Sequence, residues 1–186
     1  MTTDSTPSET TATTTPDGAA APPRTLVLVR HSKASHSAPT DLERALTSKG
    51  HRMAEDLARD LADAIGSIDL LLYSSATRAR QTAAPMEYWL TPSQARVEPE
   101  IYHEGPSSIL ALVSQLPGEV GRVVVVGHEP TISVLAHSLH DADDELASQV
   151  SFGIPTATAL VLRVPGAWED LGPSRAHLER IVTVPR

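Results

Sequence analysis

The amino-acid sequence predicts an α/β protein, a three-layer sandwich in which a mainly parallel sheet is flanked by helices on both faces. The first supporting observation is a set of short runs that are apolar at every position, such as LVLV at 26–29 and VVVV at 123–126. The second is that longer segments with apolar residues at spacings of three and four separate these runs. Strands buried on both faces belong mostly to parallel sheets, because crossover helices cover both sides.

The first half of the chain alternates strand and helix patterns. The helix at 47–65 is amphipathic, and the Thr47 hydroxyl is placed to cap it. The helix at 107–116 is followed by Pro117 and Gly118, two residue types that commonly end helices. The expected elements are strands at 24–29, 68–73 and 96–98 and helices at 47–65, 76–89 and 107–116.

The second half continues with a strand at 122–126, a helix near 130–139, and two apolar runs at 157–164 and 178–184. The stretch PGAWEDLGPS between these two runs has no helical pattern, so at least one of them is expected to be an antiparallel strand. In HSLHDADDE, the spacing of His137 and His140 is compatible with a metal site, but a solvated helix end followed by an acidic loop is the favoured interpretation.

Composition limits the class of protein. The chain has 186 residues, no cysteine and a formal net charge of −8, which excludes thiol chemistry and gives no basic surface for nucleic acid. No stretch approaches the roughly 20 apolar residues of a membrane span, and the opening segment does not resemble a signal peptide, so we expect no membrane partner and a cytoplasmic location. Residues 1–23, rich in Thr, Pro, Ser and Ala, are expected to form a disordered tail before one domain at 24–186.

Polar residues stand where three of the apolar runs end. LVLVRH ends at His31 with Arg30 beside it, VVVVGH ends at His128, and Arg78 follows LLLY near the start of the next helix. In an open α/β sheet ligands bind at the carboxyl ends of the strands, so these four side chains are expected to meet. Two arginines facing two histidines match a tetrahedral phosphoryl group, and neighbouring guanidinium groups keep an imidazole neutral and nucleophilic. Such a histidine can accept a phosphoryl group covalently, and no metal is required where arginines stabilise the charge.

The segments VRHSKA, LTSKG, SSATRARQT and VGHEP, in this order and at these intervals, resemble the histidine phosphatase (phosphoglycerate mutase-like) superfamily, especially its short SixA-type phosphohistidine phosphatases. The resemblance implies a phosphoglycerate mutase-like fold without a large cap domain, so that residues 24–186 form a histidine phosphatase domain. It implies that His31 is the phosphorylated nucleophile. Arg30, Arg78 and His128 would complete the phosphate pocket.

Further residues follow from the same resemblance. Arg44 matches an arginine that precedes the L-T-x-x-G turn and is expected to bind substrate phosphate, and Ser32 stands where Gly is commoner and is expected to contribute to substrate binding. Larger branches of the superfamily carry an acidic proton donor, for which Glu100 and Glu104 are the candidates here. Lys33, His36 and Asp41, in the loop after His31, could shape the mouth of the site, although ordinary loop charge is the default interpretation.

The function predicted is a metal-independent phosphatase, without a cofactor, that forms a phosphohistidine enzyme intermediate and hydrolyses phosphohistidine on a protein. Its partner would be a phosphorylated protein or a small phosphorylated substrate. The resemblance to SixA-type members, which lack this acidic proton donor, favours leaving groups that depart easily, such as imidazole. A phosphatase for small phosphate esters, a non-catalytic phosphate-binding module and a metal-dependent hydrolase are the alternatives.

Overall fold

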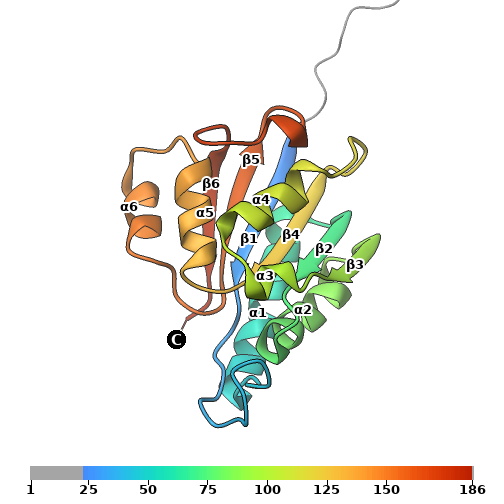
Figure 1. Cartoon of the computed structure of the whole chain (residues 1–186), viewed down its shortest axis with the longest axis vertical. Coiled ribbons are helices and arrows are strands. Elements are labelled where there is room, and N and C mark those ends of the chain that lie inside the picture. Colours follow the sequence, from blue (N-terminus) through green and yellow to red (C-terminus); the bar gives the residue numbers. More distant parts are fainter. Residues whose placement is uncertain (1–22, 186) are drawn as a thin grey trace, which may run out of the picture.

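A six-stranded sheet forms the centre of the computed structural model, which describes residues 23–185 (Figure 1). The strand order is β3-β2-β4-β1-β5-β6; neighbours from β3 to β1 are parallel, whereas β5 is antiparallel to both β1 and β6. The mainly parallel sheet and the expected antiparallel strand are confirmed. The strands are β1 (Arg24–Arg30), β2 (Leu70–Tyr73), β3 (Gln94–Val97), β4 (Arg122–Gly127), β5 (Thr158–Val164) and β6 (His177–Thr183).

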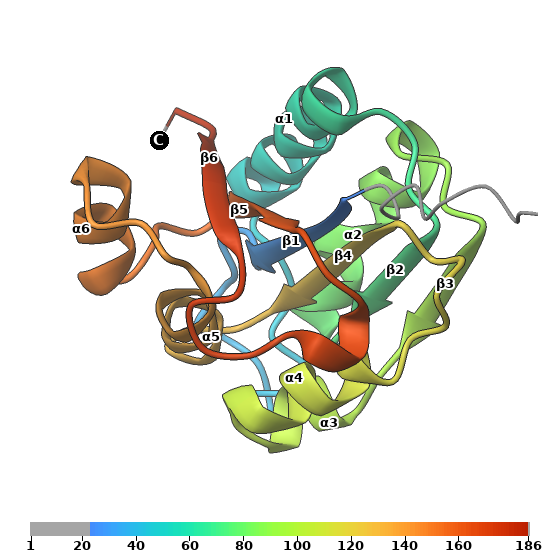
Figure 2. The ribbon, with the colours of Figure 1, turned by 90° about the horizontal axis from the view of Figure 1, so that it is seen from above.

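Helices cover both faces of the sheet (Figure 2). One face carries α1 (Ser48–Ile65) and α2 (Thr77–Trp89). The other carries α3 (Glu100–His103), α4 (Pro106–Ser114), α5 (Thr131–Leu139), α6 (Glu145–Ser151) and the short 3₁₀ helix η1 (Trp168–Asp170). The three-layer sandwich is thereby confirmed, and the described residues contain no large cap domain.

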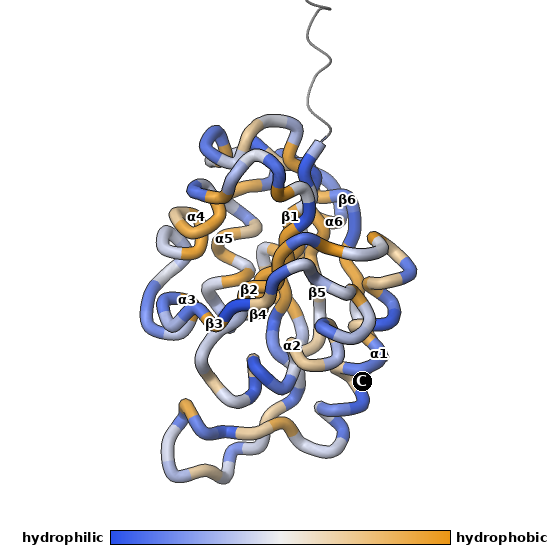
Figure 3. The backbone as a smooth tube through the Cα atoms, turned by 90° about the vertical axis from the view of Figure 1, so that its right-hand side faces the viewer, coloured by the Kyte–Doolittle hydropathy of each residue, from blue (hydrophilic) through white to orange (hydrophobic). Residues whose placement is uncertain are grey.

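The apolar runs supply two cores because successive side chains of a strand point to opposite faces. In β1, Leu26 and Leu28 pack among the residues of α4 and α5, and Val27 and Val29 pack among those of α1 and α2. All four are fully buried. Figure 3 shows the hydrophobic segments gathered at the centre of the molecule, with hydrophilic loops around them.

Thr47 caps α1 as predicted, since its side chain accepts a hydrogen bond from the Gly50 N–H. Three short helices were not predicted. The acidic stretch expected to be a loop instead begins α6, where the Asp144 side chain accepts from the N–H groups of Leu146 and Ala147. Helices α3 and η1 have only four and three residues, too few to show a helical period in the sequence.

The predicted tail at 1–23 lies, except for Pro23, outside the described residues. Within residues 23–185, no helix is long and apolar enough to cross a membrane.

Candidate active site

The carboxyl ends of β1, β2 and β4 bring the predicted site residues to one edge of the sheet. Arg30 on β1 lies opposite Gly127 on β4 in parallel register, so His31 and His128 leave neighbouring strands side by side. Their ring centroids are 5.1 Å apart. Arg78 lies in the first turn of α2, just beyond β2, and donates from Nε to Nε2 of His31 at 3.2 Å. The structure therefore brings Arg30, His31, Arg78 and His128 together.

The hydrogen bonds of His31 define its tautomer. Nδ1 lies 2.7 Å from the carbonyl oxygen of Ser32, and because a carbonyl only accepts, the proton is on Nδ1. Nε2, which accepts from Arg78, therefore carries the lone pair. This arrangement orients a neutral imidazole with its nucleophilic nitrogen toward the arginine side chains.

His128 is held by Ser74, a fully buried residue just after β2. Nε2 of His128 lies 2.7 Å from the Ser74 hydroxyl, which already accepts from the Ala76 N–H at 3.2 Å. We assign the hydroxyl proton to the bond with Nε2, which leaves the ring proton on Nδ1. Nδ1 is buried and has no hydrogen-bond partner among the described residues.

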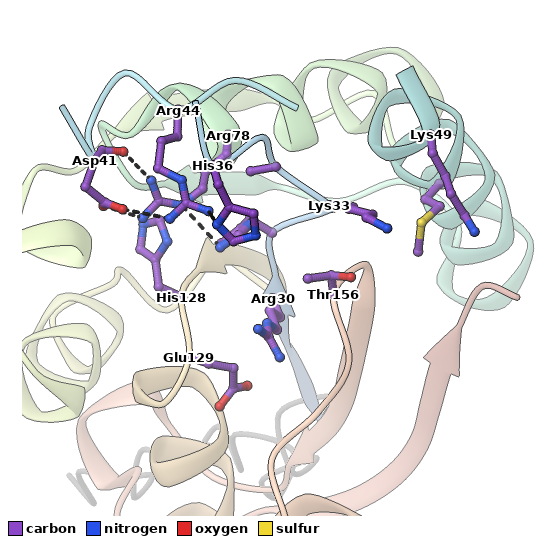
Figure 4. Close-up of a pocket in the computed structure, with 13 residues that line it drawn as sticks. Arg30, Lys33, His36, Asp41, Arg44, Lys49, Arg78, His128, Glu129 and Thr156 are labelled. Carbon is purple, nitrogen blue, oxygen red and sulfur yellow. Dashed lines mark hydrogen bonds and ion pairs between the residues drawn. The ribbon is translucent and has the colours of Figure 1, made fainter. Parts of the chain in front are cut away.

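Asp41 has a larger role than the ordinary loop charge that the sequence analysis favoured. Its carboxylate accepts from Arg78 Nη2 at 2.8 Å, from Arg44 Nη1 at 2.9 Å and from the Tyr102 hydroxyl at 3.0 Å, and its backbone carbonyl accepts from Arg78 Nη1 at 2.6 Å. The only signal in the sequence is the spacing of three residues between Asp41 and Arg44. Asp41 is thus an anchor for both guanidinium groups, rather than ordinary loop charge (Figure 4).

These groups surround a pocket of about 560 Å³. Its lining has five cationic side chains (Arg30, Lys33, Arg44, Lys49 and Arg78) against two carboxylates, those of Asp41 and Glu129. The chain as a whole carries a net charge of −8, so the pocket has a local charge opposite to that of the molecule. Such a pocket selects an anion, and guanidinium forks match the oxygens of a phosphoryl group.

The surroundings shift the pKa values of the titratable groups. Burial is the main cause that lowers the pKa of His31 to about 4, with Arg78 and Arg30 adding to it. Burial, followed by the proximity of His31, lowers the pKa of His128 to about 3. The hydrogen bond from Arg44 is the main cause that holds the pKa of Asp41 well below its usual range. At neutral pH both rings are neutral and Asp41 is a carboxylate.

Three residues named from the resemblance do not line this pocket. Ser32 is fully buried, and its hydroxyl donates to the carbonyl of Gly50 at 2.7 Å, because the loop after His31 packs against the first turn of α1. Glu100 begins α3, and the Glu104 carboxylate accepts from the Ser108 hydroxyl. A further carboxylate does line the pocket. It belongs to Glu129, directly after His128, which the sequence analysis did not name as a site residue.

Arg44 lies at the pocket as expected, donating from Nε to the Ser35 carbonyl at 2.7 Å and from Nη2 to Nδ1 of His36 at 3.2 Å. Within residues 23–185 no group of three or more His, Asp or Glu side chains is arranged to hold a metal ion.

The fold and the site define a phosphoglycerate mutase-like α/β protein with a histidine-centred anion pocket, and comparisons with known proteins name the family. The family model of the histidine phosphatase superfamily (branch 1) matches residues 26–103. An uncharacterized protein of Mycobacterium tuberculosis is 34% identical over 154 residues, covering 81% of this chain and 96% of that protein.

Comparison with solved structures leads to the same family. One assigned as a SixA phosphohistidine phosphatase, from Nakamurella multipartitia, is 33% identical with a TM-score of 0.80, over 90% of this chain and 100% of that one. A phosphoglycerate mutase from Plasmodium falciparum is 15% identical with a TM-score of 0.57, over 88% of this chain and 90% of that one, and its likeness concerns the fold alone. The chain belongs to the histidine phosphatase superfamily, in its SixA type, and is a phosphatase.

Proposed function

We propose that this protein is a metal-independent phosphatase that hydrolyses phosphohistidine on a protein through a phosphorylated His31. The observation that carries the proposal is the orientation of His31. Its Nδ1–H is bound to the Ser32 carbonyl, and its Nε2 lone pair faces a pocket lined by five Lys and Arg side chains. A nucleophile with a fixed tautomer beside a preorganised anion site is suited to phosphoryl transfer.

In the first step, Nε2 of His31 attacks the phosphorus atom, a new N–P bond forms, and the P–N bond to the substrate imidazole breaks. Arg78 exchanges its bond to Nε2 for one to a phosphoryl oxygen, and Arg30 and the Nδ1–H of His128 bind the other oxygens. The electron pair of the broken bond stays on the substrate imidazole. That ring leaves neutral when its other nitrogen carries a proton.

In the second step, water attacks the phosphorus of phosphorylated His31. The bond to Nε2 breaks, its electron pair returns to His31, and inorganic phosphate leaves with one proton of the water retained and the other released. Burial and the surrounding arginines disfavour a charged imidazolium at His31, so they favour return of this side chain to its neutral form.

The carboxylates of the pocket support a P–N substrate. Asp41 is ion-paired with two arginines and its pKa lies below the usual range, so it has no proton to donate. Glu100 and Glu104 do not line the pocket. A small phosphate ester needs a protonated leaving oxygen, and Glu129 is the remaining lining carboxylate for that alternative.

The test uses a peptide carrying radiolabelled phosphohistidine and the variant His31→Asn. The wild-type protein is expected to release phosphate after exhaustive treatment with EDTA and 1,10-phenanthroline. In rapid quench it should hold a phosphoryl group that is stable to alkali and labile to acid. His31→Asn should lose turnover and labelling, whereas His51→Ala, which changes an exposed histidine of α1, should keep both.

Retained turnover in a folded His31→Asn variant would exclude this mechanism. Loss of turnover on chelation, restored by a divalent metal, would favour the metal-dependent hydrolase. Equal kcat/KM for the phosphohistidine peptide and for alkyl phosphate esters, with both rates reduced in Glu129→Gln, would favour the ester phosphatase.

A further inference from the structure

A second hollow, of about 530 Å³, adjoins the phosphate pocket, and we call it the flanking groove. Arg30 and Glu129 line both cavities, so the two lie next to each other with these side chains at their boundary. In Figure 4 these two side chains lie on the same side of the cluster that Asp41, Arg44 and Arg78 form. The rest of the groove combines apolar side chains, among them Val134, Phe152 and Pro155, with polar groups such as the Ser133 and Ser151 hydroxyls.

Two exposed apolar side chains stand at this groove. Phe152, the only phenylalanine of the chain, is 92% exposed, and Val134 is 51% exposed. Phe152 follows α6 and Val134 lies on α5, two helices that pack side by side in both ribbon views (Figures 1 and 2). A side chain with 92% of its surface in water adds almost nothing to the folded core, and clustered exposed apolar groups are typical of binding sites.

Hydrogen bonds tie the floor of the groove to the phosphate pocket. The Ser133 hydroxyl donates to the Glu129 carboxylate, at 2.6 Å from Oε2, and accepts from the Ile154 N–H at 3.3 Å. The Ile154 carbonyl in turn accepts from Nη1 of Arg30 at 2.5 Å. The segment that carries Phe152 therefore also positions a phosphate-binding arginine, and the groove has a fixed place relative to the reacting phosphoryl group.

We infer that the flanking groove binds an apolar side chain next to the phosphohistidine of a protein substrate. A phosphohistidine whose phosphoryl group enters the pocket carries its neighbouring residues across the rim, where the groove begins at Arg30 and Glu129. Only a polypeptide substrate has such neighbours; a small phosphorylated molecule leaves Phe152 in water. The inference rests on the proposed function. The apolar neighbour of the phosphohistidine is the feature by which the enzyme would distinguish a protein substrate from a small phosphorylated molecule.

The expected effect follows from the burial of Phe152. Full burial of a phenylalanine side chain corresponds to about tenfold to a hundredfold in binding, and a shallow groove buries part of it, so we expect about tenfold in kcat/KM. The probes are free phosphohistidine, a phosphohistidine pentapeptide with glycine on both sides, and the same pentapeptide with leucine on both sides.

Wild-type protein is expected to prefer the leucine peptide over the glycine peptide by about tenfold. Phe152→Ser should abolish this preference and leave kcat/KM for free phosphohistidine unchanged, because Phe152 does not line the phosphate pocket. Its exposure means that the change removes no core packing. The matched control is Tyr88→Ser, which removes an aromatic side chain that is 75% exposed at the far end of α2 from Arg78.

The outcomes separate the two proposals. No turnover of any probe by the wild-type protein refutes the proposed function, and the inference falls with it. Turnover of all three probes without a leucine preference, or with a preference that survives Phe152→Ser, refutes the groove alone. Phe152→Ser could instead convert a dimer into a monomer and leave the peptide preference intact. The groove would then bind a second copy of the chain rather than the substrate, which also overturns the inference.

Discussion

Gly50→Ala is the substitution that most directly tests how α1 positions the active-site loop. A Cβ atom at position 50 would lie 2.0 Å from the carbonyl oxygen of Lys33 and 2.9 Å from its carbon. Lys33 is two residues after His31, and its carbonyl accepts from the Thr47 N–H at 2.9 Å. The Gly50 carbonyl also accepts the Ser32 hydroxyl. The glycine is thus required by a close approach of two backbones.

The magnitude follows from the contact. Cβ atoms essentially never approach a heavy atom within 3.0 Å, so the Lys33 carbonyl must retreat by about 1 Å. Overpacking of this kind costs about 1–3 kcal/mol of unfolding free energy, and each kcal/mol lowers the Tm of a domain of this size by about 2–4 °C. A displacement of about 1 Å passed on to His31 would lower kcat/KM by about 100-fold.

The assay combines thermal unfolding with kcat/KM on a phosphohistidine peptide. The control is Gly172→Ala, since a Cβ at position 172 meets no atom within 4 Å. We expect the control to match the wild-type protein in both measurements. If Gly50→Ala keeps both its Tm and its kcat/KM, then α1 does not constrain the loop, and the reasoning is refuted.

The remaining predictions concern charge and capping. Because burial lowers the pKa of His31 to about 4 and that of His128 to about 3, their ring NMR signals should stay constant from about pH 8 to about pH 5; titration of either near its ordinary pKa of 6.5 would contradict this. The pKa values of His31 and His128 are lower in the folded than in the unfolded protein. Their contribution to the unfolding free energy should therefore be greatest above about pH 6.5 and fall as the pH drops toward 4, which urea denaturation at several pH values can measure. Asp41→Asn should raise KM by up to about tenfold, with a smaller change in kcat, because it removes the charge that orients Arg78. An unchanged KM would count against this role. The control is Asp56→Asn, on the exposed face of α1. Thr47→Ala should lower the unfolding free energy by about 0.5–2 kcal/mol through loss of the α1 cap, whereas Thr47→Ser should restore it; equal stability of the two variants would show that the cap contributes nothing.

The large elements could be predicted because they carry a long periodic signal. The helix at 47–65 repeats its apolar residues over several turns, and VVVV at 123–126 is apolar at every position, so burial alone determines their structure. The short helices escaped prediction for the opposite reason. Helix α3 has four residues, and α6 begins in an acidic stretch whose capping by Asp144 depends on backbone geometry.

The sequence by itself determined the class of fold and the meeting of His31, Arg78 and His128, because the end of a parallel strand fixes the edge of the sheet at which its next residue lies. Only the tertiary structure decided which loop residues enter the pocket. It turned Ser32 toward Gly50, placed Asp41 between two arginines, and brought Glu129 to the rim. The path of a loop depends on contacts with distant elements, and no local pattern of residue types records those contacts.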